Sequence, residues 1–219
     1  SRLNTDYLDI CLVHALGEGT SLFSAALKRI PGLKASEKIR QEEKKRLLEE
    51  NLLSAVETLK KAGKIRFLGA SSHGPYFMKD LMMTAIKSGH YDLIMIAFNF
   101  LKFPEVPLIL HEAEKNTVGL IAMKTLAGAK AMNLDPDGES FEREAFKWTL
   151  KQRGVNGLVV TIKSTDQLDL YVKASGKGFR ASDQALLDQY KKLYNAKHCR
   201  TGCGECLDSC SSNVNIATI

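Results

Sequence analysis

The sequence predicts an α/β fold built around a parallel sheet, and two features of its patterning carry that prediction. Short, fully apolar runs recur along the chain and alternate with longer segments whose apolar residues repeat at helical spacing. Strands of this kind are buried on both faces, which is typical of βαβ units. The pattern is compatible with an open, doubly wound sheet or with a barrel. No G-x-G-x-x-G motif follows the first strand, which disfavours the dinucleotide-binding open sheet.

The elements follow one another in a regular order. Strands are predicted at the apolar runs Tyr7–Val13, Ile65–Ala70, Leu93–Asn99, Gly119–Thr125 and Gly157–Ile162. A loop rich in Gly and Ser, Ala15–Ser36, follows the first strand. Helices are predicted at the amphipathic segments Glu42–Ala62, Tyr76–Ser88, Pro107–Asn116, Phe141–Arg153, Asp166–Ala174 and Ser182–Ala196.

Two of these helices show their inward faces clearly. In Glu42–Ala62 one stripe at helical spacing is apolar, and Gly63 is placed to end the helix. The residues of that stripe are Leu48, Leu52, Val56 and Leu59. In the last helix, the residues expected to face inward are Leu186, Leu187, Tyr190 and Leu193.

Composition and charge exclude some classes of function. The 219 residues are 44% hydrophobic and 26% charged, with a net charge of +6. The basic residues alternate with acids along the helices, as in Gln41–Arg46, which indicates a solvated face rather than a nucleic-acid-binding stripe. No apolar run approaches the roughly 18 residues that a membrane span needs. We therefore expect neither nucleic acid as a partner nor a membrane span.

Four of the five cysteines gather near the end of the chain, at Cys199, Cys203, Cys206 and Cys210. This clustering predicts a metal or cluster site rather than disulfides, and it separates a tail, 198–219, from a main domain, 1–197. The C-x3-C-x2-C-x3-C spacing is one residue longer in its first gap than that of bacterial ferredoxins, and Ser211 replaces their proline. A 4Fe-4S cluster is the expected occupant. Tetrahedral zinc and a metal-free tail are the alternatives.

Three segments resemble the aldo-keto reductase family. Leu3–Val13 with His14 resembles its fourth strand, Leu59–Gly69 its fourth helix and fifth strand, and Gly119–Leu126 its seventh strand in members that carry a ferredoxin-like motif. The resemblance implies the C-terminal five-eighths of a (β/α)8 TIM barrel, strands four to eight, followed by the short Cys-rich tail. The family's catalytic tyrosine, lysine and aspartate belong to the first three strands. Since Ser1 begins within a motif, we expect an N-terminal portion to precede it.

The resemblance also assigns residues to the active site. His14 matches the histidine that orients the substrate carbonyl and supports proton transfer, a role suited to imidazole. Without the resemblance, a hydrogen-bonded core histidine is an equal reading. Ser71 and Ser72 match the Ser-Asn pair that contacts the nicotinamide carboxamide, with the second position changed to a shorter hydroxyl.

Strands six to eight supply the remaining predicted contacts to the cofactor. Asn99 matches the family's aromatic-Asn pair, although Met95 stands where a glutamine is common. Lys124 and Leu126 follow the seventh strand, where many members have an aromatic residue and then Ser-Pro-Leu. A lysine there is suited to a phosphate or a substrate anion, and a solvent-facing lysine is the alternative. Gly128 begins a loop expected to lie over the pyrophosphate.

The end of the last strand is expected to select the nucleotide. Lys163 and Ser164 match the residues that bind the 2′-phosphate of NADPH, and Gln167 matches a glutamine of the family's next helix. No arginine follows within the next turn, and Tyr171 replaces an asparagine, so NADP(H) and NAD(H) both stay open as the cofactor.

The combined prediction is an NAD(P)H-dependent oxidoreductase that acts on a small-molecule carbonyl or alcohol and carries an iron–sulfur cluster. The sequence as given is expected to be catalytically deficient on its own. Reduced cysteines favour the cytoplasm, and an export signal on a preceding segment would not be visible here. The alternative is a non-enzymatic iron–sulfur protein on a barrel scaffold that transfers electrons or binds a partner. The departures at Met95 and Lys124 favour it.

Overall fold

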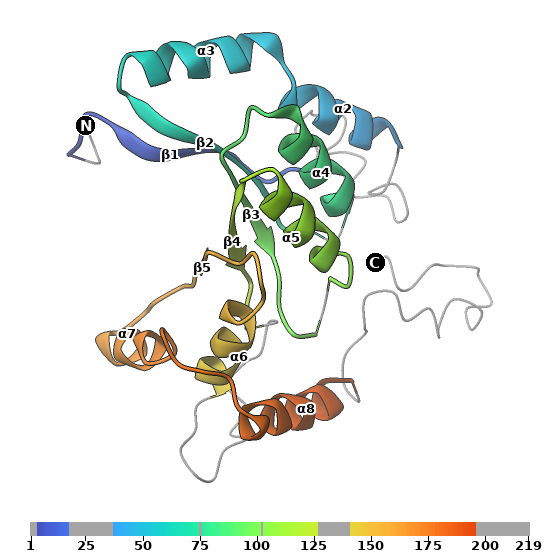
Figure 1. Cartoon of the computed structure of the whole chain (residues 1–219), viewed down its shortest axis with the longest axis vertical. Helices are drawn as coiled ribbons and strands as arrows, with labels where there is room; N and C mark the ends of the chain where they lie inside the picture. Colours follow the sequence, from blue (N-terminus) through green and yellow to red (C-terminus); the bar gives the residue numbers. More distant parts are fainter. Residues whose placement is uncertain (1–3, 18–36, 75, 102, 127–140, 196–219) are drawn as a thin grey trace. The chain divides into compact units, whose positions relative to one another are not determined.

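The computed structural model describes residues 4–17, 37–74, 76–101, 103–126 and 141–195. Its five strands form one sheet in the order β1-β2-β3-β4-β5 (Figure 1), and the pairs β1–β2, β2–β3 and β4–β5 are parallel. The strands are β1 (Leu8–Val13), β2 (Ile65–Ser72), β3 (Leu93–Ala97), β4 (Gly119–Met123) and β5 (Gly157–Leu158). The helices are α2 (Glu37–Leu47), α3 (Glu50–Lys61), α4 (Met78–Ser88), α5 (Val106–Lys115), α6 (Phe141–Leu150), α7 (Thr165–Val172) and α8 (Ala181–Asn195). The predicted α/β fold with a parallel sheet is confirmed.

The described residues form two compact units. Unit 1 runs to Ile96 and also takes in Glu105–Leu120, so it holds β1, β2 and the helices α2 to α5. Unit 2 takes in Ala97–Pro104 and the described chain from Ile121 onward, with β5 and the helices α6 to α8.

Strand β2 lies between β1 and β3 in unit 1 and needs a glycine at its centre. Gly69 is paired with Leu12 on one side and Leu93 on the other. A Cβ at this position would collide with Cδ2 of Leu12 and would lie 3.1 Å from the carbonyl oxygen of Leu93. A side chain here would require both the Leu12 side chain and the Leu93 backbone to shift, so glycine favours this close packing of neighbouring strands.

The single helix predicted over Glu42–Ala62 is wrong: the structure has two helices, α2 and α3, separated at Leu48 and Glu49. The hydroxyl of Tyr91 donates a hydrogen bond, at 2.8 Å, to the carbonyl of Leu47 at the end of α2, where the last carbonyls of a helix lack intrahelical partners. The predicted inward stripe is also only partly right. Val56 is buried, whereas Leu48 and Leu59 are 44% and 40% exposed.

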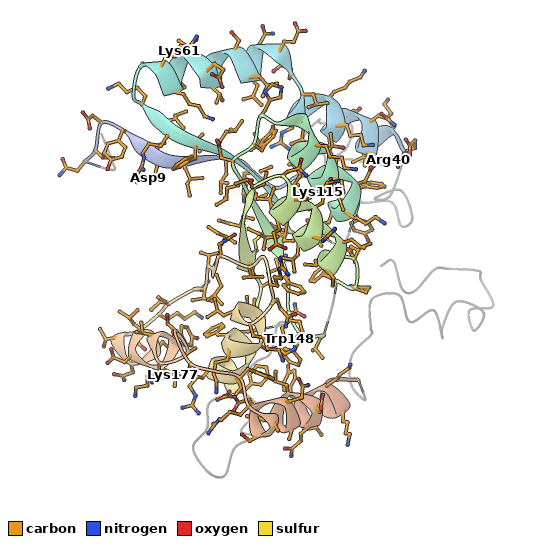
Figure 2. All side chains as sticks on the ribbon, in the orientation of Figure 1. Asp9, Arg40, Lys61, Lys115, Trp148 and Lys177 are labelled. Atoms are coloured by element: carbon orange, nitrogen blue, oxygen red, sulfur yellow. The ribbon has the colours of Figure 1, made fainter. Side chains whose placement is uncertain are left out.

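A glycine marks the end of α3, and ion pairs hold α2 against α4. Gly63 has φ +69° just after α3, as expected of a glycine that ends a helix. Helix α2 contacts α4 through two cations that share one carboxylate: Arg40, labelled in Figure 2, lies 3.2 Å and Lys44 2.9 Å from Oδ2 of Asp80. These contacts join helices that are far apart in the sequence.

Unit 2 has an aromatic core around α6 and α8. The rings of Phe141 and Tyr190 have centroids 4.3 Å apart, and the ring of Trp148 (Figure 2) packs 5.3 Å from that of Phe98. In α8, Leu187 and Tyr190 are buried as predicted. Leu193, predicted to face inward, is 37% exposed.

The last strand is shorter than predicted. The expected Gly157–Ile162 becomes Gly157–Leu158, followed by one further hydrogen bond from the amide of Val159 to the carbonyl of Ala122. The reason lies in the partner strand: β4 ends at Met123, and Lys124 turns away with φ +55°. Without a partner backbone, an apolar run cannot continue as a ladder.

The described helices are short compared with the thickness of a bilayer. The longest, α8, has 15 residues, whereas a membrane span needs about 20 mostly apolar ones. None of the helices in the described part of the chain has the length and apolar character to cross a membrane.

Candidate functional site

In unit 1, the turn that follows β1 is fastened to the end of β2 by its two serines. The amide of Ala15 donates to Oγ of Ser71 at 3.1 Å, and the amide of Leu16 donates to the carbonyl of Ser71 at 2.8 Å. The hydroxyl of Ser72 donates to the carbonyl of Leu16 at 3.0 Å. The turn therefore has a fixed backbone position, although Ala15 itself adopts φ +58°.

His14 begins this turn, at the C-terminal end of β1, with an exposed side chain. Its carbonyl accepts a hydrogen bond from Nη2 of Arg46 at 2.6 Å, which holds the residue from the backbone side. The imidazole of His73, just past β2, packs edge-on against that of His14 with centroids 5.4 Å apart. The sequence assigned no role to His73. Its position after a predicted strand, next to a serine pair, was the signal that could have found it.

Ser71 and Ser72 lie at the predicted strand end, but both are fully buried. The hydroxyl of Ser72 also accepts from the amide of Gly74 at 3.3 Å, so it donates and accepts within the protein. The structure brings both serines beside His14 through the turn. Their contact with a nicotinamide carboxamide stays a prediction.

In unit 2, Asn99 and Lys124 are brought together. The side-chain amide of Asn99 donates to the carbonyl of Lys124 at 3.1 Å, and its Oδ1 accepts from the amide of Leu101 at 3.0 Å. Asn99 is 2% exposed, whereas the side chain of Lys124 is exposed. The ammonium group of Lys124 forms no ion pair with any described residue. It is therefore available to an anion.

A cleft of ≈ 400 Å³ opens beside Lys124 at the C-terminal ends of β4 and β5. Its walls come from the residues just after each strand, namely Met123, Lys124, Thr125 and Leu126 and then Val159, Val160 and Thr161. Oγ1 of Thr125 is buried and has no hydrogen-bond partner among the described residues. A buried hydroxyl without a partner costs about 1–3 kcal/mol unless a ligand satisfies it.

Of the residues that form this cleft, the sequence prediction found Lys124 and Leu126 and missed Thr125 and Thr161. The signal for both was available, because each hydroxyl stands at or near the C-terminal end of a predicted strand, Gly119–Thr125 or Gly157–Ile162. Strand ends of a parallel sheet are where such folds place their ligands.

The predicted nucleotide-selecting residues form a helix cap in unit 2. Ser164 is the N-cap of α7, and its Oγ accepts from the amide of Gln167 at 3.3 Å. Oε1 of Gln167 in turn accepts from the amide of Lys163 at 2.8 Å, which completes a reciprocal cap. The ammonium group of Lys163 forms no ion pair within the described residues. Tyr171, one helix turn further on, packs edge-on against Phe146 with centroids 4.9 Å apart.

Some predicted site residues lie outside the described residues: Gly128 and the four tail cysteines Cys199, Cys203, Cys206 and Cys210. Within the described ranges, no group of three or more His, Cys, Asp or Glu side chains is placed to hold a metal ion. Cys11 is a free, half-buried cysteine in β1. The predicted boundary between domain and tail, at 197 and 198, also falls outside the described ranges.

Comparison with known proteins gives a consistent set of likenesses. The family model described as Aldo/keto reductase family matches residues 1–144. The holo form of aldo-keto reductase AKR11C1 from Bacillus halodurans superposes with a TM-score of 0.56 at 17% identity, over 86% of this chain and 62% of that one. A Klebsiella pneumoniae aldo-keto reductase in complex with NADPH gives 0.56 at 20% identity, over 87% and 61%. The chain thus spans just over three fifths of the structures it matches. No curated protein matches it.

Proposed function

Because the chain belongs to the aldo/keto reductase family, we propose that it is part of an NAD(P)H-dependent oxidoreductase that interconverts a small-molecule carbonyl and its alcohol. The observation that carries the proposal is the cleft at the C-terminal ends of β4 and β5. It combines an available cation, Lys124, with a buried hydroxyl, Thr125, that lacks a partner. This is the end of the strands at which barrels of this type place their active sites.

The residues of unit 2 fit a nicotinamide nucleotide in their chemistry. Such a cofactor supplies or accepts a hydride when it is bound. Lys124 offers a positive charge to a phosphate, and the hydroxyl of Thr125 offers a hydrogen bond in an otherwise apolar wall. The ammonium of Lys163 would bind a 2′-phosphate beside the capped start of α7, which favours NADP(H) over NAD(H).

In unit 1, the proposed catalytic residue is His14. Its exposed imidazole would orient the substrate carbonyl and support proton transfer. The backbone bonds that hold its turn to β2 would keep the ring in place. Ser71 and Ser72 would act here mainly by supporting that turn, with the carboxamide contact as a second role.

Binding of nucleotide tests the proposal without requiring turnover. Titration with NADPH and NADH, followed by nucleotide fluorescence, should show saturable binding. Lys163→Gln should weaken NADPH binding about tenfold, since one charge-assisted hydrogen bond is lost, and leave NADH binding unchanged. Lys192→Gln, on the exposed side of α8, is the matched control and should change neither. If the complete protein binds neither NADPH nor NADH, the enzyme proposal is wrong.

We also propose that the tail binds a 4Fe-4S cluster through Cys199, Cys203, Cys206 and Cys210. Four closely spaced cysteines are the donor set that such a cluster requires. No alternative metal site competes with them among the described residues. A tail that needs reduced thiolates to hold its cluster supports a cytoplasmic location, because thiols are kept reduced there. An electron-transfer partner would follow from a cluster that is redox-active.

Iron, acid-labile sulfide and zinc content of anaerobically purified protein tests the cluster. About four irons and four sulfides per chain are expected for one cubane. Cys206→Ala should abolish the sulfide content, whereas Cys11→Ala, the matched control within β1, should leave it intact. Zinc without sulfide would contradict the cluster and make the tail a structural clip.

A second function is supported by a specific observation. The hydroxyls of Ser71 and Ser72 are fully buried, and that of Ser72 is engaged by the backbone at both ends. This favours a non-enzymatic iron–sulfur protein that uses the barrel scaffold to transfer electrons. The two measurements above distinguish these functions, because the non-enzymatic protein would contain iron and sulfide but would not bind a nicotinamide nucleotide.

A further inference from the structure

Unit 2 contains a second cleft, separate from the one at the strand ends. It has a volume of ≈ 500 Å³ and lies between α6 and the segment that joins α7 to α8. Its lining residues are five cations and a glycine, namely Arg143, Lys147, Lys173, Lys177, Gly178 and Arg180. We propose that this basic cleft is a binding site for a compact polyanion, a small molecule that carries two or more phosphate groups.

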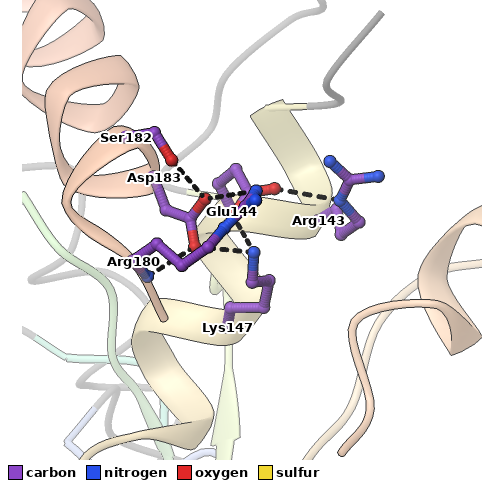
Figure 3. Close-up of polar contacts among 6 residues, drawn as sticks. All are labelled: Arg143, Glu144, Lys147, Arg180, Ser182 and Asp183. Carbon is purple, nitrogen blue, oxygen red and sulfur yellow. Dashed lines mark hydrogen bonds and ion pairs between the residues drawn. The ribbon is translucent and has the colours of Figure 1, made fainter. Parts of the chain in front are cut away.

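A buried ion network holds one side of the basic cleft (Figure 3). Nζ of Lys147 lies 2.6 Å from Oε2 of Glu144 and 2.6 Å from Oδ2 of Asp183, and both carboxylates are fully buried. Nε of Arg143 lies 2.9 Å from Glu144, and Nη2 of Arg180 lies 3.2 Å from Asp183. The two carboxylates therefore fix cations from α6 and from the start of α8 within a single arrangement.

The network keeps its central lysine charged. Burial by itself would lower the pKa of Lys147, but hydrogen bonds from its ammonium to Asp183 and Glu144 raise it. The ammonium is therefore a permanent feature of the wall at neutral pH. Cations that are held in place before a ligand arrives lose little side-chain entropy on binding, which favours affinity.

The other side of the basic cleft has cations without partners. Lys173 and Lys177 (Figure 2) are exposed, and their ammonium groups form no ion pair with any described residue. They face the same cleft as Arg143, Lys147 and Arg180. Glu144 and Asp183 offset part of the positive charge, but Lys173 and Lys177 add two further cations that no described carboxylate pairs with, and these repel the rest. An anion in the cleft would relieve that repulsion.

The lining chemistry selects phosphate groups over other ligands. Guanidinium groups bind phosphate oxygens in pairs, and lysines add point charges around them. A Cβ built on Gly178 meets no atom within 4 Å, so this part of the wall is open for a ligand to approach. The volume lies within the range of about 300–1,000 Å³ found for small-molecule sites. The five cations together with the two buried carboxylates, Glu144 and Asp183, leave a net charge of about +3, which exceeds the roughly two negative charges of one phosphate group and points to two or more.

Calorimetric titration of the full chain with inorganic tripolyphosphate tests the proposal. We expect saturable binding that weakens with added salt. The double variant Lys173→Gln and Lys177→Gln should raise the Kd about tenfold or more, because it removes two charge-assisted contacts. The matched control, Lys191→Gln with Lys192→Gln on α8, removes the same charge outside the lining and should change the Kd less than about twofold. Circular dichroism checks that both variants fold.

Three results would overturn the proposal. The first is the absence of saturable binding up to about 1 mM tripolyphosphate, which is a negligible affinity. The second is an equal loss of affinity in the two double variants, which would show attraction by net charge alone. The third is a loss of tripolyphosphate affinity in Lys163→Gln with no loss of affinity in the double variant at Lys173 and Lys177. That pattern would assign the anion to the proposed nucleotide site instead.

Discussion

Lys124 has a backbone conformation that its side chain disfavours. Its φ of +55° lies in the left-handed region, where a residue with a Cβ is strained by about 1–2 kcal/mol. The residue ends β4, lines the cleft at the strand ends and gives its carbonyl to Asn99. Strain of this kind is often found where a side chain has to be presented to a ligand. The cation is thus placed at a cost to stability.

Replacing Lys124 tests this cost. Lys124→Gly should leave the protein about 1 kcal/mol more stable than Lys124→Ala, because only glycine adopts a positive φ without strain. At positions with a negative φ, the alanine variant is instead the more stable of the two. Urea unfolding of the two variants gives the comparison, and both lack the charge, so electrostatics cancel. An alanine variant that equals or exceeds the glycine variant would show that the position is unstrained.

At the scale of elements, one buried hydroxyl binds the chain at the break between α2 and α3. Tyr91 is buried, and its hydroxyl donates to the carbonyl of Leu47 at the end of α2. Burial raises the pKa of Tyr91 to about 12, although the charge of Arg46 opposes the shift. The neutral phenol is therefore the form that the folded protein prefers.

Tyr91→Phe should lower the free energy of unfolding at neutral pH by about 1 kcal/mol, because a buried carbonyl loses its donor. The wild-type contribution is present below pH 10, the ordinary value, and is lost as the pH rises toward about 12. Urea unfolding at neutral and alkaline pH should show this slope in the wild type and not in the variant. Tyr7→Phe, at an exposed tyrosine, is the control. Equal alkaline slopes in wild type and Tyr91→Phe would contradict the assignment.

The contact between α6 and α8 makes a second pH-dependent contribution, at acid pH. Burial opposes ionisation of Asp183, but hydrogen bonds from Lys147 and Arg180 hold its pKa well below the ordinary value of 3.8. A carboxylate whose pKa is lowered by folding stabilises the fold at pH values above the pKa that it has in the unfolded chain. Its contribution is lost as the pH falls below about 4.

Asp183→Asn should destabilise the chain by about 3 kcal/mol at neutral pH, since it leaves Lys147 with one fewer buried counter-charge. The same variant should flatten the decline in stability between neutral pH and pH 3. Thermal unfolding across that range measures both effects. Asp188→Asn, at an exposed position of α8, should change stability by less than about 0.5 kcal/mol. A similarly small change in Asp183→Asn would show that the network contributes little.

The sequence predicted the alternation of elements well, because burial on both faces of parallel strands leaves a strong apolar signal. It failed where a tertiary contact decides the outcome. Nothing local to Glu42–Ala62 announces that the hydroxyl of Tyr91 takes the carbonyl of Leu47. In the same way, Gly157–Ile162 reads as a full strand, yet its partner β4 turns away at Lys124. The spacing of apolar residues along the sequence contains no information about either of these tertiary features.

The candidate site was only partly predictable for a related reason. Strand ends are visible in a sequence, so Lys124 and Lys163 could be named from resemblance and position. The basic cleft could not. Its cations come from α6 and from 173–180, and Asp183 and Glu144 draw together three of them, Arg143, Lys147 and Arg180. Residues that are neighbours only in the folded chain leave no motif.

At the scale of the whole molecule, β1 is an end strand of the sheet in the described part of the chain. It leaves apolar side chains exposed: Tyr7, before the strand, is 45% exposed, and Leu8 and Ile10 are 38% and 37% exposed. A strand edge with exposed apolar side chains is a template for association with another chain. We therefore expect the 219-residue chain as given to self-associate as its concentration rises. In a longer chain that carries the family's preceding strand, that strand would pair with this edge instead.

Ile10→Lys should shift this equilibrium toward the monomer, because a charged residue at an edge strand opposes pairing. Size-exclusion chromatography with light scattering, over a range of concentrations, measures the shift. Leu108→Lys, at a residue of α5 that is 56% exposed, is the matched control and should leave association unchanged. Comparable dissociation by both variants would mean that association does not involve this edge.

Ser71 and Ser72 hold the turn after β1 by hydrogen bonds, and this has a consequence for how position 14 can evolve. Between residues that the structure describes, the hydrogen bonds that fix the turn use backbone atoms of 14–16 together with Ser71, Ser72 and Arg46. The imidazole of His14 is not among them. Selection is therefore free to exchange the side chain at position 14, and with it the chemistry presented there, without having to rebuild the strand that supports it.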